Sequence, residues 1–168
     1  TVKIRNAKTG KWEEISKTKP TIFQEKDEIK TETNASITIQ IIEKAVVKVA
    51  EKTEVIIASL EKNDKNQIQN FKMDLRHGAI FAKVSDIVPD TGKFVIITPN
   101  AVTGVRGTTF EVSHSEENKQ TTFAVLEGEV EVMSRIDTGI KLILSSNNKM
   151  TQGSDGFFTN IEPLTQEE

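Results

Sequence analysis

The sequence predicts an all-β fold, and three observations support that prediction. First, side chains branched at Cβ dominate: 19 Ile and 14 Val stand against 6 Leu, with 19 Thr beside them. Branching at Cβ restricts χ1 and suits the pleated surface of a strand better than a helix. Second, several segments alternate polar and apolar residues with period two, which is typical of a strand with one buried face. Third, segments rich in Asn, Asp, Gly and Pro separate these runs and indicate turns.

The N-terminal half contains several candidate strands in order. They are expected at residues 11–15, 19–23, 36–41, 47–49 and 53–57. A helix over residues 43–60 is the alternative, because Glu-Lys-Ala and Glu-Lys steps favour helix. The Val and Ile content of the same segment favours strands. Residues 61–70 are polar and rich in Asn and Asp, so we expect a loop or a hairpin connection there.

The most informative pattern lies between Ile97 and Val132, where two strand-like runs flank the polar residues 113–120. An unbulged hairpin with residues 113–120 as its loop would place Val112 opposite Thr121. Opposed aromatic or oppositely charged pairs contribute about 0.2–1 kcal/mol each. A slip of one residue would move every side chain to the wrong face. The expected cross-strand pairs are Phe110 with Phe123, Thr108 with Val125, and Arg106 with Glu127.

The same region carries a family resemblance. A Thr98-Pro99 opening, a Gly-Thr-x-Phe-x-Val strand at residues 107–112 and a Glu-Gly-x-Val step at residues 127–130 resemble the core of the FecR family. The resemblance extends over roughly residues 11–156 and implies one FecR-like domain of stacked short strands, β-solenoid-like or sandwich-like. It leaves residues 1–10 as an N-terminal extension and residues 157–168 as a C-terminal tail or linker. Lys26 stands where the family usually has glycine.

We expect the key residues of this motif to be structural. In this interpretation the glycines ease the chain through a bulge, the threonines fill a strand and Arg106 pairs with Glu127. The alternative makes Arg106, Gly107 and Thr108 a small anion site, since Arg offers a fork of donors and a Gly-rich turn exposes backbone N–H groups. The motif residues are Gly104, Arg106, Gly107, Thr108, Phe110, Glu127 and Gly128.

A weak internal echo suggests that one local structure occurs twice. When residues 75–82 are laid over residues 125–132, Gly78 falls on Gly128 and the apolar positions coincide. A glycine inside a strand often marks a bulge or a close backbone approach. We therefore expect two similar strand corners.

Several classes of function are disfavoured by composition. The chain has no Cys, and His77 and His114 lie at no ligand spacing, so we expect neither a metal nor a cofactor. No nucleophile motif is present, and a sugar-active site would need a carboxylate pair in an aromatic groove, whereas the chain has one Trp and no Tyr. We therefore expect no enzyme and no catalytic residues. With 22 basic and 25 acidic residues and no basic block, nucleic acid is not an expected partner.

No membrane span is expected within this chain. The longest apolar runs, such as residues 94–97, have about four residues, against roughly 20 for a spanning helix. No signal peptide is evident at Thr1, so we expect a processed or truncated fragment whose anchoring would depend on flanking sequence.

The FecR resemblance implies a bacterial, extracytoplasmic protein-binding module, periplasmic or at the cell surface. The best-known branch of the family relays a ferric-siderophore signal from an outer-membrane receptor to a sigma factor, so a receptor signalling domain or another envelope protein is the implied partner. Exposed strand edges are one means of binding it. Glu127, Glu129 and Glu131 would share one face and could meet a basic partner or simply be solvated. The alternative function is a structural or adhesive domain of a secreted or surface-attached protein.

Overall fold

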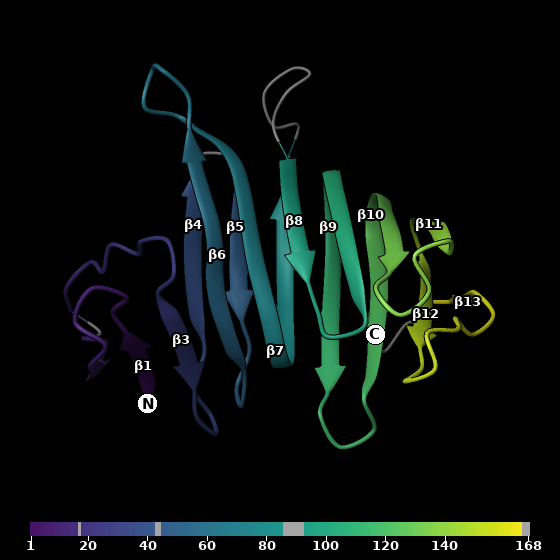
Figure 1. Ribbon diagram of the computed structural model, residues 1–168, viewed down its shortest axis with the longest axis horizontal. Helices are drawn as coiled ribbons and strands as arrows, with labels where there is room; N and C mark the ends of the chain where they lie inside the picture. The colour runs from purple at the N-terminus through teal and green to yellow at the C-terminus, as the bar shows by residue number, and fades with distance from the viewer. Residues whose placement is uncertain (17, 43–44, 86–92, 166–168) are drawn as a thin grey trace.

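The computed structural model describes residues 1–16, 18–42, 45–85 and 93–165. All regular secondary structure in these ranges is β-strand (Figure 1). The all-β prediction is therefore confirmed. The strands are β1 (Val2–Arg5), β2 (Trp12–Glu14), β3 (Glu28–Thr31), β4 (Ile37–Ile42), β5 (Ala45–Val49), β6 (Glu54–Lys62), β7 (Ile68–Val84), β8 (Lys93–Ile97), β9 (Ala101–Ser115), β10 (Gln120–Ser134), β11 (Lys141–Ser145), β12 (Asn148–Gln152) and β13 (Glu162–Pro163).

Three long strands connect two layers of one sheet. The first half of β7 pairs with β6 and β8, while its second half pairs with β5 and β9. Strands β9 and β10 divide their partners in the same way. The first layer therefore runs β2-β1-β3-β6-β7-β8-β9-β10-β11, and the second runs β4-β5-β7-β9-β10-β12-β13. The arrangement is sandwich-like, although its central strands are long rather than short.

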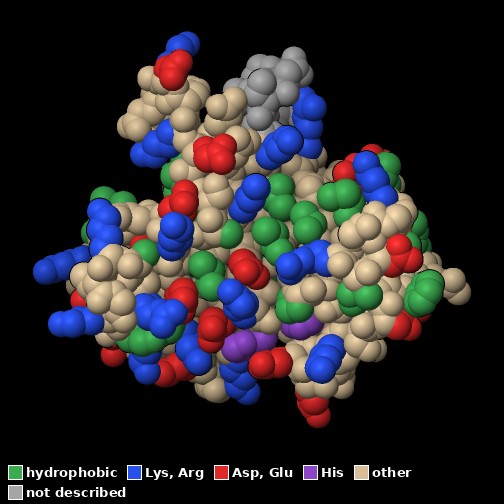
Figure 2. All heavy atoms as spheres, in the orientation of Figure 1, with side chains coloured by type: hydrophobic (Ala, Val, Ile, Leu, Met, Phe, Trp, Pro, Cys, Tyr) green, Lys and Arg blue, Asp and Glu red, His purple; other side chains and the backbone are tan. Residues whose placement is uncertain are grey.

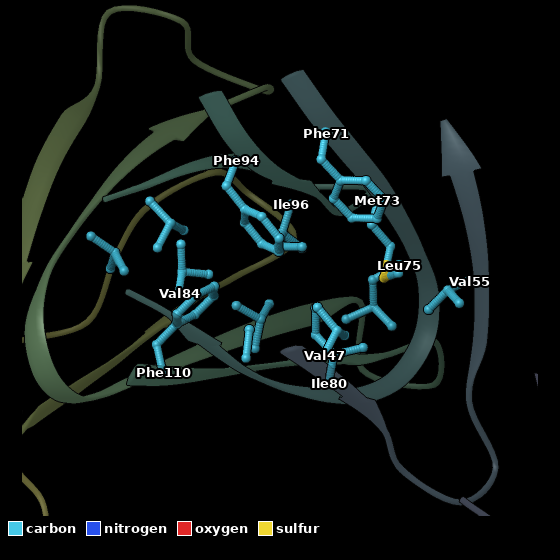
Figure 3. Packing of buried hydrophobic residues seen from close by; sticks show 14 of the residues in the cluster. Val47, Val55, Phe71, Met73, Leu75, Ile80, Val84, Phe94, Ile96 and Phe110 are labelled. Atoms are coloured by element: carbon cyan, nitrogen blue, oxygen red, sulfur yellow. The ribbon is translucent and has the colours of Figure 1, made fainter. Parts of the chain in front are cut away.

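The hydrophobic core fills the space between the two layers. Figure 3 shows Phe71, Met73 and Phe94 of the first layer pointing toward Ile80 and Phe110 of the second. The rings of Phe71 and Phe94 stack with their centroids 5.3 Å apart. All five side chains are at most 3% exposed. Burying each such side chain contributes about 1.5–3 kcal/mol, so this contact between the layers is a main source of stability.

The buried face of each long strand changes where the strand passes between layers. In β9, Thr103 and Val105 point inward, and beyond Gly107 the inward positions become Thr108 and Phe110. Side chains in a strand alternate with a period of two, so this change of parity requires an irregular step. The step allows one strand to present apolar residues to the same core from both layers.

Two corners of this kind have matching chemistry, as the internal echo suggested. Gly78 in β7 has φ +92°, and a Cβ added there would lie 2.6 Å from Thr53 Cα. The Thr53 hydroxyl lies 2.9 Å from the Glu51 carbonyl and 3.3 Å from the Ala79 carbonyl, and it accepts a hydrogen bond from Ala79 N–H at 3.0 Å. The threonine thus joins its own turn to the backbone just after the glycine.

The second corner repeats the close glycine and the two carbonyl contacts of the threonine hydroxyl. Gly128 in β10 has φ +80°, and a Cβ there would lie 2.5 Å from the Gly107 carbonyl oxygen. The Thr108 hydroxyl lies 2.7 Å from the Glu129 carbonyl and 2.9 Å from the Arg106 carbonyl. The residue before each threonine also has positive φ: +51° at Lys52 and +61° at Gly107. We call each such pair a Thr–Gly corner: Thr53 with Gly78, and Thr108 with Gly128.

Two strand predictions in the N-terminal half need correction or refinement. The strand expected at residues 19–23 is absent, and Ile22 is 85% exposed. Pro20 lacks a backbone donor, and no described strand lies alongside to pair with this segment. The expected connection at 61–70 is shorter, because β6 continues to Lys62 and β7 begins at Ile68. Residues 43–44 of the alternative helix lie outside the described ranges, whereas β5 and β6 occupy 45–49 and 54–62.

The central hairpin is tighter than expected, and its predicted register is wrong. Strand β9 continues to Ser115 and β10 begins at Gln120, so the polar loop is about half the expected length. Phe110 therefore lies opposite Val125 rather than Phe123, and Val112 lies opposite Phe123. The register is shifted by two residues, an even number, so the side chains at these positions still point toward the core. Ser113 and His114 are polar but still pair with β10, because backbone hydrogen bonds form the ladder whatever the polarity of the side chains.

The ends of the chain also join the sheet. In the N-terminal extension, β1 pairs with β2 and β3, and in the C-terminal tail, β13 pairs with β12. The division into residues 1–10, 11–156 and 157–168 stays a prediction. In the described part of the chain, no helix has the length and apolarity to cross a membrane.

Candidate functional site

A groove crosses the outer face of the first layer, over strands β8 to β11. Register places Val95 beside Gly104, Gly104 beside Glu131, and Glu131 beside Ile143. Lys72 of β7 extends this row at the other end, next to Val95. The row thus crosses five strands, and its middle member, Gly104, has no side chain. Here it is called the outer groove, and its volume is about 840 Å³.

A second row makes the outer groove apolar. Ile97, Val102 and Met133 are neighbours across β8, β9 and β10. Met133 is 40% exposed and Ile143 is 56% exposed, so both large apolar side chains are in contact with solvent. Figure 2 shows hydrophobic side chains gathered on this face, with lysine and arginine side chains around them. Such contiguous exposed apolar surface often marks a site of interaction.

Gly104 gives the outer groove its depth. Unlike the corner glycines, it has no positive φ, and a Cβ added there would meet no atom within 4 Å. Neither backbone conformation nor internal packing therefore demands glycine. Glycine inside a strand weakens it by roughly 0.5–1 kcal/mol, since it offers no side chain to pack. The physical consequence of glycine at this position is an open space above the strand.

The carboxylates around the outer groove have partners. Glu131 Oε2 lies 2.7 Å from Lys141 Nζ. Asp74, at the end of the second row, lies 3.5 Å from Arg76. These pairs are exposed and contribute little to stability. They neutralise the acidic side of the rim.

The basic side of the rim differs. Lys72 and Lys93 are exposed neighbours of the apolar rows on β7 and β8. Within the described ranges, neither ammonium group makes an ion pair. Arg106 lies opposite Glu129 across β9 and β10. The outer groove therefore has an apolar floor and, at its β7–β8 end, two lysines that make no ion pair with a described residue.

The predicted pair of Arg106 and Glu127 does not form in the ladder. Arg106 lies opposite Glu129, while Glu127 lies opposite Thr109 and accepts a hydrogen bond from its hydroxyl at 3.1 Å. Two compensating irregularities flank Glu127, where the strand turns at Gly128. Glu129 and Glu131 line the outer groove, but Glu127 lies in a separate shallow depression. The expected shared face of three carboxylates is thus reduced to two.

The alternative anion site gains no support from its threonine. Thr108 is 2% exposed, and its hydroxyl is directed at backbone carbonyls as part of the corner. Gly107 has φ +61° and its carbonyl oxygen closely approaches Gly128. Phe110 is 1% exposed in the core. The motif residues thus divide: Gly107, Thr108, Phe110 and Gly128 are in the corner or core, and Gly104 and Arg106 line the outer groove.

The two histidines line one depression together with Glu116. His114 lies in β9 rather than in the expected loop and is 5% exposed, and its Nδ1 lies 2.9 Å from Thr121 Oγ1. Burial lowers the pKa of His114, against a smaller opposing effect of Glu116. His77 Nδ1 lies 3.9 Å from Glu116 Oε2. Across the described residues, no group of three or more His, Cys, Asp and Glu side chains could hold a metal ion.

Sequence reasoning missed the outer groove because its residues come from five separate strands. Met133 and Ile143 could have been noticed as apolar residues on the outward parity of their strands. Lys72 and Lys93 are unremarkable lysines until the parallel pairing of β7 and β8 brings them to one rim. Only the register brings these side chains together.

The chain is similar to one family of known proteins. The sequence profile of one family, described as FecR protein, matches residues 27–131, more than half of the chain. This match confirms the resemblance noted in the sequence. It includes both Thr–Gly corners and most of the outer groove, whereas Met133 and Ile143 lie just beyond it. A comparison with curated proteins gives no match.

Two solved structures share the fold. Both are crystal structures of a proposed anti-sigma factor from Parabacteroides distasonis, each with a TM-score of 0.65 and 18% sequence identity. The alignment covers 83% of this chain and 61% of that protein, so this chain spans less than two thirds of its length. At this identity the likeness shows a common fold.

Proposed function

Because the chain belongs to the FecR family, we propose that it is a protein-binding module that senses or relays a signal in the bacterial cell envelope. In this role it acts outside the cytoplasm, in the periplasm or at the cell surface. It binds a receptor signalling domain or another envelope protein, and its occupancy affects a sigma factor and hence transcription. The module itself performs no chemistry.

The outer groove is the observation that carries this proposal. A partner that covers Met133 and Ile143 removes exposed apolar surface from water, which is the main favourable term in association. The charged rim adds selectivity and a faster rate of encounter. A rigid two-layer sheet beneath the groove supports a preformed surface, which reduces the entropy lost on binding.

The relatives support the regulatory part of the proposal. The proposed anti-sigma factor from Parabacteroides distasonis has the same fold. A sigma-factor role is consistent with a sensing domain that is one part of a larger protein. The iron-uptake branch of the family is the specific pathway we propose, with a ferric-siderophore receptor as the source of the signal.

A genetic experiment tests the role. In the source cell, we expect deletion of the gene to change, severalfold, the transcript levels of a set of genes that share one sigma factor. The change should depend on iron supply and should be reversed by the wild-type gene. Unchanged transcripts, together with a loss of surface attachment, would instead support a structural or adhesive domain.

A fusion experiment tests the location. Alkaline phosphatase, which is active only outside the cytoplasm, is fused after Glu168 of the full protein. We expect phosphatase activity in intact cells, with a β-galactosidase fusion at the same position as the matched control. Activity of the β-galactosidase fusion alone would contradict an extracytoplasmic location.

A further inference from the structure

We propose that the outer groove binds a segment of a protein partner in which an apolar side chain lies next to carboxylates. The apolar side chain lies over Gly104, and the carboxylates meet Lys72 and Lys93. This inference rests on the proposed function, since it specifies the chemistry of the partner. It assigns the binding to one face of the molecule.

The apolar half of the inference comes from the floor of the groove. Val95, Ile97, Val102 and Met133 surround the space above Gly104, and Ile143 borders it across Glu131. A branched apolar side chain placed there would contact aliphatic groups from several strands. Because no atom lies within 4 Å of the Cβ position of Gly104, the space is open for a side chain from outside.

The acidic half comes from the charge balance of the rim. Glu131 is neutralised by Lys141 at 2.7 Å, and Asp74 lies 3.5 Å from Arg76. At the β7–β8 end, the ammonium groups of Lys72 and Lys93 make no ion pair with any described residue. A carboxylate partner forms a charge-assisted hydrogen bond with such an ammonium group.

The shape of the groove favours a protein segment over a small molecule. The groove is open to solvent along a sheet face, whereas small-molecule pockets enclose most of the ligand. From β8 to β11 it crosses three inter-strand steps, about 14 Å at about 4.8 Å per step. An extended chain of about four residues spans that length. A short linear segment therefore matches the groove in length.

The binding test uses two synthetic, fluorescently labelled hexapeptides. The acidic probe is Glu-Asp-Ile-Leu-Asp-Glu, and the basic probe has Lys at its four charged positions. Fluorescence anisotropy with the purified chain measures both affinities at low and physiological salt. We expect the acidic probe to bind at least about tenfold more tightly than the basic probe, and added salt to weaken that binding.

Substitutions on the rim and the floor locate the binding. Reversing both charges, Lys72→Glu with Lys93→Glu, should lower the affinity for the acidic probe at least about tenfold. The matched control reverses two exposed lysines elsewhere, Lys48→Glu with Lys62→Glu, and should leave it nearly unchanged. Gly104→Leu fills the groove and should abolish binding.

A second apolar substitution controls for a general effect of added hydrophobic surface. Thr38→Leu places the same side chain on exposed β4, away from the outer groove, and should leave the affinity unchanged. Three outcomes would overturn the inference: neither hexapeptide binds, Gly104→Leu binds as tightly as wild type, or both charge reversals weaken binding equally. Binding to phosphatidylglycerol vesicles in place of the acidic probe would also overturn it, because the groove would then serve a lipid surface.

A cellular experiment separates this inference from the proposed function. The Gly104→Leu variant replaces the wild-type gene in the source cell, and sigma-dependent transcripts are measured beside those of the deletion. If the deletion changes transcripts and Gly104→Leu does not, the groove inference fails and the proposed function stands. If the deletion has no effect while the purified chain still binds the acidic probe as expected, the proposed function fails.

Discussion

The Thr–Gly corners and the outer groove use glycine for opposite purposes. At Gly78 and Gly128, positive φ and the close approach of another backbone leave no room for a side chain. At Gly104 the backbone is ordinary for a strand and the space above it is empty. The corners need glycine for the fold, whereas glycine at position 104 shapes a surface. The comparison shows that glycines of one motif can differ completely in what a substitution would change.

The largest expected effect is at the corners. Gly128→Ala and Gly78→Ala should each lower the free energy of unfolding by about 2–5 kcal/mol, from left-handed strain together with overlap with the neighbouring backbone. Gly107→Val should also damage folding, because its φ of +61° is unfavourable for a branched side chain. Urea unfolding followed by circular dichroism measures the change. A Gly128→Ala protein as stable as wild type would refute the description of the corner.

The corner threonines should show the next largest effect. Thr108→Val and Thr53→Val keep the shape of the side chain but remove the hydroxyl that bonds to the backbone on both sides of the corner. Buried polar backbone groups would lose a partner, so each change should cost about 1–3 kcal/mol. The half-buried pair Thr122 and Thr151, whose hydroxyls bond to each other at 2.9 Å, offers a control in Thr122→Val. Equal losses at Thr108 and Thr122 would show that the corner bond has no special weight.

The buried histidine gives a dependence on pH. Because burial lowers the pKa of His114 from its ordinary value of 6.5, the unfolded chain binds a proton more readily than the folded one. Stability is therefore complete above about pH 6.5 and decreases as the pH falls below that value. We expect the urea midpoint to fall between pH 7.5 and 5.5 in wild type and to fall less in His114→Gln.

The nearby charges provide a control for the pH experiment. His77 opposes protonation of His114 and Glu116 favours it, and both face the same region. The substitution His77→Asn should leave most of the pH dependence in place, because burial is the larger cause. If the dependence disappears in His77→Asn and persists in His114→Gln, the assignment to His114 is wrong.

The smallest expected effect concerns a lysine in a conformation that suits glycine. Lys26 has φ +69° at the position where the family usually has glycine, and it precedes Asp27, whose carboxylate accepts hydrogen bonds from Ala7 and Gln24. Replacing Lys26 with Gly should raise the free energy of unfolding by about 1 kcal/mol or less. The control Lys48→Gly lies within β5 and should lower it by about 0.5–1 kcal/mol. A loss of stability in Lys26→Gly would show that the lysine side chain matters more than its backbone.

The strand content and the corners could be predicted from the sequence because both depend on local chemistry. Branched residues with period two indicate strands, and the coincidence of Gly78 with Gly128 indicates a repeated corner from the sequence alone. The register between β9 and β10 could not be predicted in the same way. It depends on how many polar residues between Val112 and Thr121 join the ladder, and backbone hydrogen bonds decide that number.

The outer groove was beyond prediction for a different reason. Its two rows consist of residues far apart in the chain, with Lys72 at one end and Ile143 at the other, and only the cross-strand pairing brings these residues into one row. Arg106 likewise lies opposite Glu129 instead of Glu127 because the whole hairpin is shifted by two residues from the predicted register. Contacts across several strands depend on the register of each one, so a single error displaces them all.

The most direct test of the contrast between corner and groove is equilibrium urea unfolding of Gly104→Leu beside Gly128→Ala. Leucine at position 104 meets no atom at its Cβ and has a better β-propensity than glycine. We therefore expect the stability of Gly104→Leu to be unchanged or to rise by up to about 1 kcal/mol, while that of Gly128→Ala falls. A loss at position 104 as large as that at position 128 would contradict the division between a glycine that makes the fold and one that leaves a surface open.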